Sequence, residues 1–437
     1  MLSGNDHPLA GLGVIEAERR IRSGKVSPVE LVRACLERIR AQDGTLRAWV
    51  HLDEAGALAL AGQREREARR KRFVGPLHGI PAGIKDIIDV AGMPTTAGAR
   101  PFAHRKPQED AAAVARLRAA GAILLGKTAT TEFAYRDPAP TRNPWNPEHT
   151  PGGSSSGSAA AVAAWMVPLA LGSQTVGSVL RPAAYCGVVG LKATHGLVPT
   201  AGVVPLAWSL DHVGVFARGV ADIAIALGVL VGRSLRAPGV RAPRIALPPE
   251  LMARAEPEVA AQISSAADRF ARAGARVHEV KLPASFSVLH AAGLAVLEAE
   301  AAAYHEPTFR DHAGEYGTQI RAMIETGLQS LATTYLNANR YRLAFRADAL
   351  ELLAGYDALL APTAPGPAPR GLASTGDASL CAPWSFAGVP AITLPSGIAA
   401  SGLPHAIQLV AAADQEARLL GVAAWCERQL GFGDRGP

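Results

Sequence analysis

The chain has 437 residues, of which 49% are hydrophobic, so it can fill a sizeable folded core. Its formal net charge is +6, but only seven of the 44 basic residues are lysines and the arginines are scattered. No basic surface with interleaved aromatic residues is visible, which argues against a nucleic-acid partner. The longest apolar stretch, residues 159–171, is shorter than the ~20 residues of a membrane span and contains a proline, so no membrane association is expected.

Residues 1–70 are expected to form an N-terminal helical segment. Ser27–Glu30 predicts a helix start, because the serine can act as cap, the proline suits the first helical position and the glutamate completes a capping box. Leu31, Cys35 and Ile39 then recur at intervals of four and form one apolar stripe. The N-terminus lacks the basic and apolar regions of a signal peptide, and the four cysteines have no disulfide or zinc spacing. These features indicate a reducing cytoplasm.

The rest of the chain contains segments typical of strands and of helices. Residues 73–220 alternate short apolar runs with helical segments, which predicts an α/β sheet flanked by helices. A strand is expected at 245–247 and an amphipathic helix at 256–275, and residues 283–355 read as mostly helical. No repeat is present, and no linker is long or polar enough to separate two domains. We therefore expect one domain over residues 1–437.

Three segments carry residue types that suit acyl transfer. They are Gly79–Asp86 with Lys85, Pro151–Ser158 with Ser154, and Gly172–Ser178 with Ser178. A hydroxyl is a poor nucleophile until a base removes its proton, and a lysine serves as that base only when it is neutral. The apolar and small residues around Lys85 favour burial, which penalises the ammonium and lowers a lysine pKa.

These segments resemble the amidase signature family of Ser-cisSer-Lys hydrolases. The resemblance covers nearly the whole chain, densely from 75 to 220 and thinly from 230 to 350. Further segments that resemble the family are 31–39, 116–128, 131–134, 142–146, 181–192, 209–214, 357–363 and 388–397. The resemblance implies the amidase signature fold, with a central mixed β-sheet flanked by helices on both faces in a single domain. Residues 73–220 would be its signature core, and the variable region 283–355 would shape the substrate pocket.

The resemblance also implies the roles of the site residues. Ser178 would be the nucleophile, Ser154 the proton relay after a cis Gly153–Ser154 bond, and Lys85 the base. The oxyanion hole would consist of the backbone N–H groups of Thr175, Val176, Gly177 and Ser178. Substrate-binding candidates beside matching motifs are Tyr135, Gly153, Ser155, Leu206, Trp208, Trp384 and Phe386. For the apolar and aromatic members of this set, core packing is the alternative role.

The sequence departs from the family pattern just before and after the proposed nucleophile. Where many members have an acid and an arginine, this chain has Gln174 and Leu180, and Arg181 could carry the cation one position later. Replacing both charges avoids leaving one of them buried and unpaired. Val176 stands where a glycine is common. The loop 135–141 is shorter than in aminoacyl-tRNA amidotransferase subunits.

A rival hydrolase interpretation exists within the same glycine-rich segment. Gly153–Gly157 fits the G-x-S-x-G pattern, with Ser155 as nucleophile, but that pattern requires a hydrophobic strand directly before it. Residues 146–151 contain two prolines and cannot form a central strand. The segment also lacks the lysine of a phosphate-binding loop.

Two functional hypotheses remain. The first is an amide-bond hydrolase that acts through an acyl-enzyme on a small, largely apolar or aryl amide, and that could extend to esters or carbamates. The alternative is an amidotransferase A-type subunit that delivers ammonia to a partner. Neither a metal nor an organic cofactor is expected, because the base is an amine and the oxyanion donors are backbone amides. We expect a monomer or a homodimer, without nucleic-acid or membrane partners.

Overall fold

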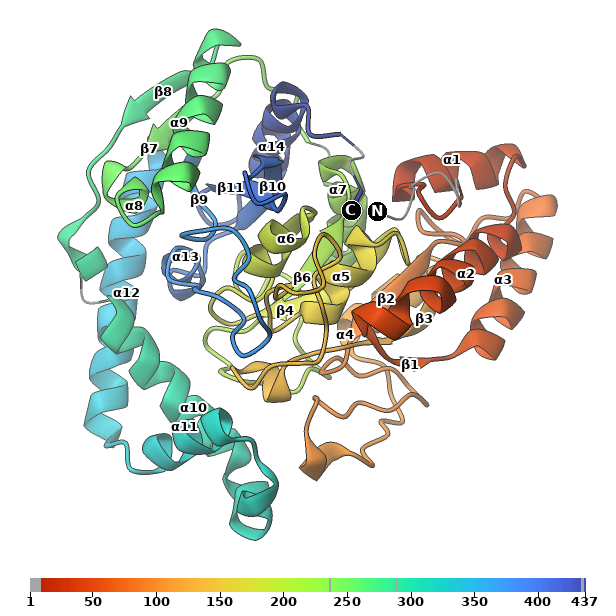
Figure 1. Cartoon of the computed structure of the whole chain (residues 1–437), viewed down its shortest axis with the longest axis horizontal. Coiled ribbons are helices and arrows are strands. Elements are labelled where there is room, and N and C mark those ends of the chain that lie inside the picture. Colours follow the sequence, from red (N-terminus) through yellow and green to blue (C-terminus); the bar gives the residue numbers. More distant parts are fainter. Residues whose placement is uncertain (1–8, 236, 288, 434–435) are drawn as a thin grey trace.

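Figure 1 shows the computed structural model of the chain, which describes residues 9–235, 237–287, 289–433 and 436–437. One eleven-stranded sheet runs through the molecule, which confirms the predicted α/β fold with a central mixed sheet. In order across the sheet, the strands are β1 (Trp49–Leu52), β3 (Ile123–Thr128), β2 (Pro81–Lys85), β4 (Leu169–Gln174), β6 (His212–Ala217), β5 (Val189–Lys192), β10 (Ala391–Ile398), β11 (Pro404–Val410), β9 (Ala358–Pro362), β7 (Arg244–Leu247) and β8 (Arg276–Glu279). The start of the chain, on which the signal-peptide expectation partly rests, lies outside the described residues.

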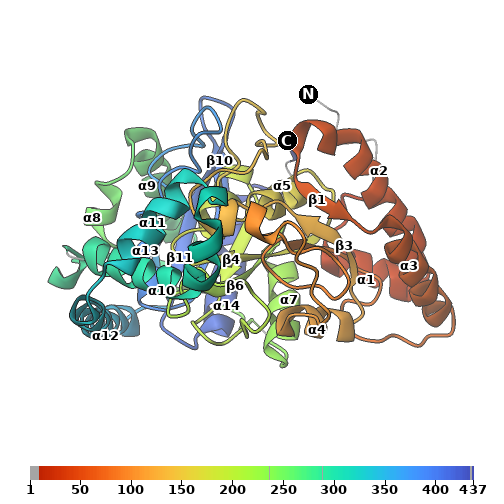
Figure 2. The ribbon, with the colours of Figure 1, turned by 90° about the horizontal axis from the view of Figure 1, so that it is seen from below.

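Helices surround this sheet. They are α1 (Val14–Ser23), α2 (Pro28–Leu46), α3 (Glu54–Arg69), α4 (Ala112–Ala119), α5 (Ser156–Ala163), α6 (Leu180–Cys186), α7 (Val220–Val231), α8 (Pro249–Met252), α9 (Pro257–Arg272), α10 (Leu289–His312), α11 (Thr318–Leu328), α12 (Ala332–Ala354), α13 (Ala382–Phe386) and α14 (Glu416–Leu430). Figures 1 and 2 show α1–α3 at one end of the molecule and α8–α12 at the other, with the sheet between them. Within the described residues, no helix combines the length and apolarity that crossing a membrane requires.

The sheet buries both of its faces. In β4, Leu169 and Leu171 belong to one apolar cluster and Ala170 to the other, and in β6 Phe216 likewise contacts a different cluster from Val215. Since successive side chains of a strand point to opposite faces, the two clusters lie on opposite sides of the sheet at β4 and β6. One cluster contains residues of α4, α7 and α14, and the other contains residues of α5 and α6 and most of the buried stripe of α2. Two buried faces explain the nearly continuous apolar strands of the sequence.

The N-terminal segment is helical except for one strand. The predicted capping box of α2 is present, because the Ser27 hydroxyl accepts from Glu30 N and the Glu30 carboxylate accepts from Ser27 N. The expectation of an entirely helical 1–70 segment misses β1, which pairs antiparallel with β3 at the edge of the sheet. Four residues of a strand are too few for their alternation to stand out between two long helices.

The strand order places two site segments side by side. β2 and β4 are parallel neighbours, with Ile84 paired to Leu171, so their carboxyl ends meet at one edge of the sheet. Lys85 ends β2, and Gln174 ends β4 directly before the segment that carries Ser178. The crevice beyond the carboxyl ends of parallel strands is the common place for a site in such sheets.

Candidate active site

Lys85 lies fully buried at the end of β2, with no exposed surface. Its Nζ donates to the hydroxyls of Ser154 and Ser173, at 2.7 Å each. Burial holds the pKa of Lys85 well below its ordinary value of 10.5, and the negative charge of Asp211 opposes that shift only in part. The geometry therefore favours a neutral amine that is in hydrogen-bond contact with a serine hydroxyl.

Ser154 belongs to a tightly held turn that leads into α5. The Gly153–Ser154 peptide bond is cis, as the resemblance implies. Thr131 N donates to the Ser154 carbonyl (3.2 Å). The first turn of α5 is held by a second hydrogen bond, in which Gly157 N donates to Ala129 O (2.9 Å). A Cβ on Gly157 would come 2.2 Å from the Ala48 carbonyl oxygen, so only glycine allows this approach. The end of β3 thus positions the serine turn beside β2.

Ser155 lies in the same turn but is engaged in the scaffold. Its hydroxyl donates to the Ser173 carbonyl (3.1 Å) and accepts from Ser173 N (3.2 Å), and its side chain is fully buried. The segment before it, residues 146–151, contains no strand. The context that a G-x-S-x-G nucleophile requires is therefore missing.

The loop that carries Ser178 is held by Gln174. The Gln174 side-chain oxygen accepts from Val179 N and Leu180 N, at 2.9 Å each, and so caps the start of α6. Its amide nitrogen donates to the Ser385 hydroxyl (2.9 Å), which in turn donates to Val176 O (2.8 Å). A neutral glutamine thus satisfies these groups without introducing a charge that would need a buried partner.

Asp211 also holds this loop. It accepts from the Thr175 hydroxyl (2.6 Å) and from the backbone N–H groups of Leu206 and Ala207. Burial raises the pKa of Asp211 to about 6, despite these hydrogen bonds. Within the described residues, the backbone N–H groups of Thr175 to Ser178 have no hydrogen-bond acceptor. They are backbone donors that the described residues leave unpaired.

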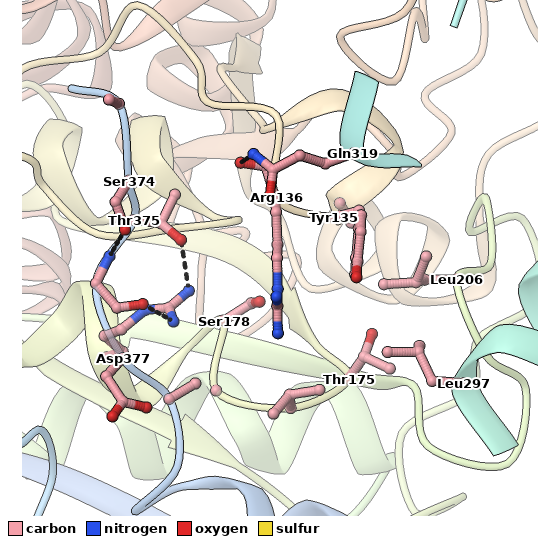
Figure 3. Close-up of a pocket in the computed structure, with 17 residues that line it drawn as sticks. Tyr135, Arg136, Thr175, Ser178, Leu206, Leu297, Gln319, Ser374, Thr375 and Asp377 are labelled. Atoms are coloured by element: carbon pink, nitrogen blue, oxygen red, sulfur yellow. Dashed lines mark hydrogen bonds between the residues drawn. The ribbon is translucent and has the colours of Figure 1, made fainter. Parts of the chain in front are cut away.

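A cavity of about 510 Å³ lies against this loop (Figure 3). It is lined by Ala134, Tyr135, Arg136, Thr175, Val176, Gly177, Ser178, Arg181, Leu206, Leu297, Gln319 and residues 373–378. A second cavity of about 330 Å³ shares Arg136, Thr175, Val176 and Leu297 with the first. Its other walls include Leu210, Phe286, Leu289, Leu294 and Phe386, so it is largely apolar. Together the two cavities form a polar chamber beside an apolar one.

The substrate-binding candidates occupy different places. Tyr135 and Leu206 line the first cavity and Phe386 lines the second. Trp208 is 52% exposed and lines a separate hollow beside Tyr304. Trp384 is fully buried and packs against the ring of Phe286 at a centroid distance of 5.8 Å.

Arg181 connects three parts of the site. Its guanidinium donates to the carbonyl of Gly153 (2.6 Å), the carbonyl of Gly376 (2.8 Å) and the hydroxyl of Thr375 (3.0 Å). Burial lowers the pKa of Arg181. The cation that the sequence suggested one position late thus ties α6 to the cis turn and to the 373–378 loop, rather than to an acid at position 174.

Several contributors to the site were not found from the sequence. Ser173 binds Lys85 as closely as Ser154 does, and Asp211 holds the loop that carries Ser178. Ser173 is detectable in principle, because a hydroxyl one residue before the end of β4 must lie near the end of its parallel neighbour β2. Arg136 and Leu297 enter the site through loop and helix packing, for which the sequence gives no signal.

The described residues contain no group of three or more histidine, cysteine, aspartate or glutamate side chains arranged to hold a metal ion. The polar atoms that Lys85 Nζ contacts are hydroxyls, and among the described residues the loop that carries Ser178 has unpaired backbone amides. This arrangement suits nucleophilic acyl transfer, in which a serine attacks a carbonyl carbon and fixed amides stabilise the resulting oxyanion.

Comparison with known proteins assigns the chain and its fold to a family. The amidase family model matches residues 30–420, and the chain belongs to this family. It is 37% identical to the A subunit of the glutamyl-tRNA(Gln) amidotransferase of Roseiflexus castenholzii (strain DSM 13941 / HLO8), over 98% of both chains. It is also 37% identical to an amidase of Pseudomonas putida, over 91% of this chain and 92% of that one. A solved amidase structure superposes with a TM-score of 0.91 at 34% identity and covers 96% of this chain and 100% of its own. The chain is an amide hydrolase of the amidase signature class.

Proposed function

We propose that Lys85, Ser154 and Ser178 form a Ser-cisSer-Lys triad that cleaves amide bonds through an acyl-enzyme. The observation that carries this proposal is the buried Lys85 amine, 2.7 Å from the Ser154 hydroxyl, in a chain that also places Ser178 in the wall of the first cavity. A lysine in this environment favours the neutral form that a base must have.

The reaction begins when the Ser178 hydroxyl oxygen attacks the amide carbonyl carbon. The Ser178 proton passes to Ser154 Oγ as the Ser154 proton passes to Lys85 Nζ, and the carbonyl oxygen becomes an oxyanion facing the amides of residues 175–178. The C–N bond then breaks as the proton returns to the leaving nitrogen. A water molecule hydrolyses the Ser178 ester by the same proton route, which releases the acid and restores the hydroxyl.

The cavities support a small, largely apolar or aryl amide as substrate. The second cavity offers Phe286, Phe386 and leucine side chains directly beside the proposed oxyanion hole. Its volume of about 330 Å³ suits one aryl or short alkyl group. Esters and carbamates present the same carbonyl geometry to Ser178, so the proposal extends to them.

The alternative function is that of an amidotransferase A-type subunit. The Roseiflexus relative bears that name at 37% identity over nearly the full length. In that case the same triad would release ammonia for a partner protein. As a hydrolase, the chain would instead act as a monomer or homodimer in the cytoplasm, and the four buried free cysteines fit a reducing compartment.

The test is turnover by the isolated chain. We expect the purified protein to hydrolyse the 4-nitroanilide or 4-nitrophenyl ester of a short acyl group at a rate that a strong chelator leaves unchanged. The matched control is Ser178→Ala, which removes only the hydroxyl and should be inactive. No turnover by the isolated chain, with activity gained only when partner proteins are added, would favour the amidotransferase alternative.

A further inference from the structure

Arg136 brings a positive charge into the proposed substrate site. Figure 3 shows its side chain extending into the first cavity toward the loop that carries Thr175 and Ser178. The same residue lines the second cavity, so Arg136 borders both chambers. Its closest described ring contact is with Tyr135, whose centroid is 5.5 Å from the guanidinium carbon.

The backbone that carries Arg136 is fixed. Asp137 accepts from the N–H groups of Gln319 and Ile320 at the start of α11, and the Gln319 side chain donates to the Arg136 carbonyl (3.3 Å). Glu132, on the other side, accepts from Gly317 N (2.9 Å). The loop is therefore tied to α11 on both sides of Arg136.

The guanidinium itself has no such partner. Among the residues that the structure describes, no carboxylate lies within ion-pair distance of Arg136 and no acceptor takes a hydrogen bond from its side chain. The nearby Glu132 and Asp137 carboxylates are occupied by α11. Asp377 lines the first cavity, but its oxygens accept from Ser379.

The charged residues that line the two cavities also favour an anionic ligand. Among the described lining residues of the two cavities, arginines stand at positions 136, 181 and 254, and the carboxylate is that of Asp377. Both terminal nitrogens of Arg181 donate to neutral oxygens, whereas no described residue accepts a hydrogen bond from the side chain of Arg136. A planar fork of free donors beside an apolar chamber is complementary to a carboxylate attached to an apolar or aryl body.

We propose that Arg136 is a specificity-determining residue and that the substrate is an amide that also carries a carboxylate, which Arg136 binds while the acyl carbon meets Ser178. This inference rests on the proposed function and narrows its substrate class from small apolar amides to those with one anionic group. The carboxylate belongs either to the acyl part or to the leaving amine.

Matched substrates test both positions of the carboxylate. On the acyl side, the mono-4-nitroanilide of glutaric acid is compared with the 4-nitroanilide of pentanoic acid. On the amine side, 3-(butanoylamino)benzoate is compared with its methyl ester at the benzoate group. We expect kcat/KM to favour the anionic member of at least one pair by about 10- to 100-fold, the range of a hydrogen bond to a charged group.

Variants identify the residue responsible. Arg136→Gln should abolish that preference, Arg136→Lys should retain part of it, and Arg136→Glu should shift it toward the 4-nitroanilide of 5-aminopentanoic acid. Arg142→Gln is the matched control, because Arg142 is close in sequence but donates to Pro147 O and lines neither cavity. An anionic preference that survives Arg136→Gln, or no preference in either pair, would overturn the inference.

Binding separates this inference from the proposed function. In Ser178→Ala, calorimetry should show that the mono-4-nitroanilide of glutaric acid, or the aminobenzoate amide, binds about 10- to 100-fold more tightly than its neutral counterpart. Adding Arg136→Gln should remove the difference. Normal turnover of neutral amides without this difference would defeat the inference alone, whereas selective binding with no turnover by the unmodified chain would defeat the proposed function alone.

Discussion

The burial of the Lys85 side chain sets its protonation state. Water stabilises an ammonium far more than an amine, so enclosing the side chain at the end of β2 shifts it toward the neutral form. Two serine hydroxyls replace the lost water, and neither carries a charge that would hold the proton in place. An amine prepared in this way can accept a proton at a pH where a surface lysine cannot.

The first prediction concerns the pH dependence of activity. Activity should rise with pH as Lys85 loses its proton and then level off in the neutral-to-alkaline range. Lys85→Met should lower kcat/KM for an anilide by about 10²–10⁴-fold, the usual contribution of general acid–base catalysis. The loss should be smaller for an activated ester, whose leaving group does not need the proton returned. Equal losses for both substrates would contradict this role of Lys85.

The same shift must appear in the pH dependence of stability. The pKa of Lys85 in the folded chain lies below 10.5, its ordinary value, which applies to the unfolded chain. At a pH between these two pKa values, the unfolded chain therefore binds more protons than the folded chain. The free energy of unfolding of the unmodified chain, relative to Lys85→Met, should therefore rise with pH in that window by up to about 1.4 kcal/mol per unit. Denaturant unfolding over a pH series measures it, and a flat difference would show that Lys85 has an ordinary pKa.

The second prediction concerns the neighbouring ion pair of Asp86 and Lys127. Lys127 Nζ lies 3.1 Å from Asp86 Oδ1, and both side chains are at most 1% exposed. Asp86→Ala would leave the Lys127 ammonium buried without its carboxylate, so the free energy of unfolding should fall by about 3–5 kcal/mol. The control is the double variant Asp86→Ala with Lys127→Met, which should recover part of that loss. A single variant as stable as the unmodified chain would refute the coupling.

At the level of elements, the start of α6 positions the proposed nucleophile. The Gln174 side chain satisfies two amides at the start of that helix and reaches α13 through Ser385. This one residue therefore joins the end of β4, the loop that carries Ser178 and a helix more than 200 residues away. We expect the backbone amides of residues 175–178 to keep their orientation, because Gln174 before them and the amides of Val179 and Leu180 after them are joined by hydrogen bonds.

The third prediction follows from this arrangement. Gln174→Ala leaves Val179 N and Leu180 N without an acceptor, which should lower the free energy of unfolding by about 2–4 kcal/mol. It should also lower kcat more than it raises KM, because misplaced oxyanion donors act in the transition state. Ser385→Ala is the control, since it keeps the cap of α6 and should cost less in both measurements. Unchanged kcat in Gln174→Ala would mean that the loop orients itself.

The sequence predicted those elements whose signals are local. The capping box of α2 and the helix at 256–275, observed as α9, follow from nearby residues. Strand β1 escaped because it is short and paired with a distant strand. The residues that line the cavities could not be predicted from local signals. Arg136, Leu297 and Phe386 meet only when three distant segments pack together. Burial of Trp384 and exposure of Trp208 are likewise set by packing, so their similar sequence contexts gave no means to tell them apart.

At the scale of the whole molecule, the sheet order brings the chemistry together. Lys85 and Ser154 are 69 residues apart in sequence, yet their side chains touch because β2 lies between β3 and β4. The helices α10 and α11 then close the cavity from the far side, through Leu297 and Gln319. Apolar clusters on both faces of the sheet support the site.

The central claim is that Ser178 is the nucleophile, and covalent labelling tests it most directly. A fluorophosphonate reacts with an activated serine, and peptide mapping by mass spectrometry locates the adduct. We predict one adduct per chain, on Ser178, that is absent from Ser178→Ala and strongly slowed in Lys85→Met. An adduct on Ser154, on Ser155 or on a cysteine would contradict the account.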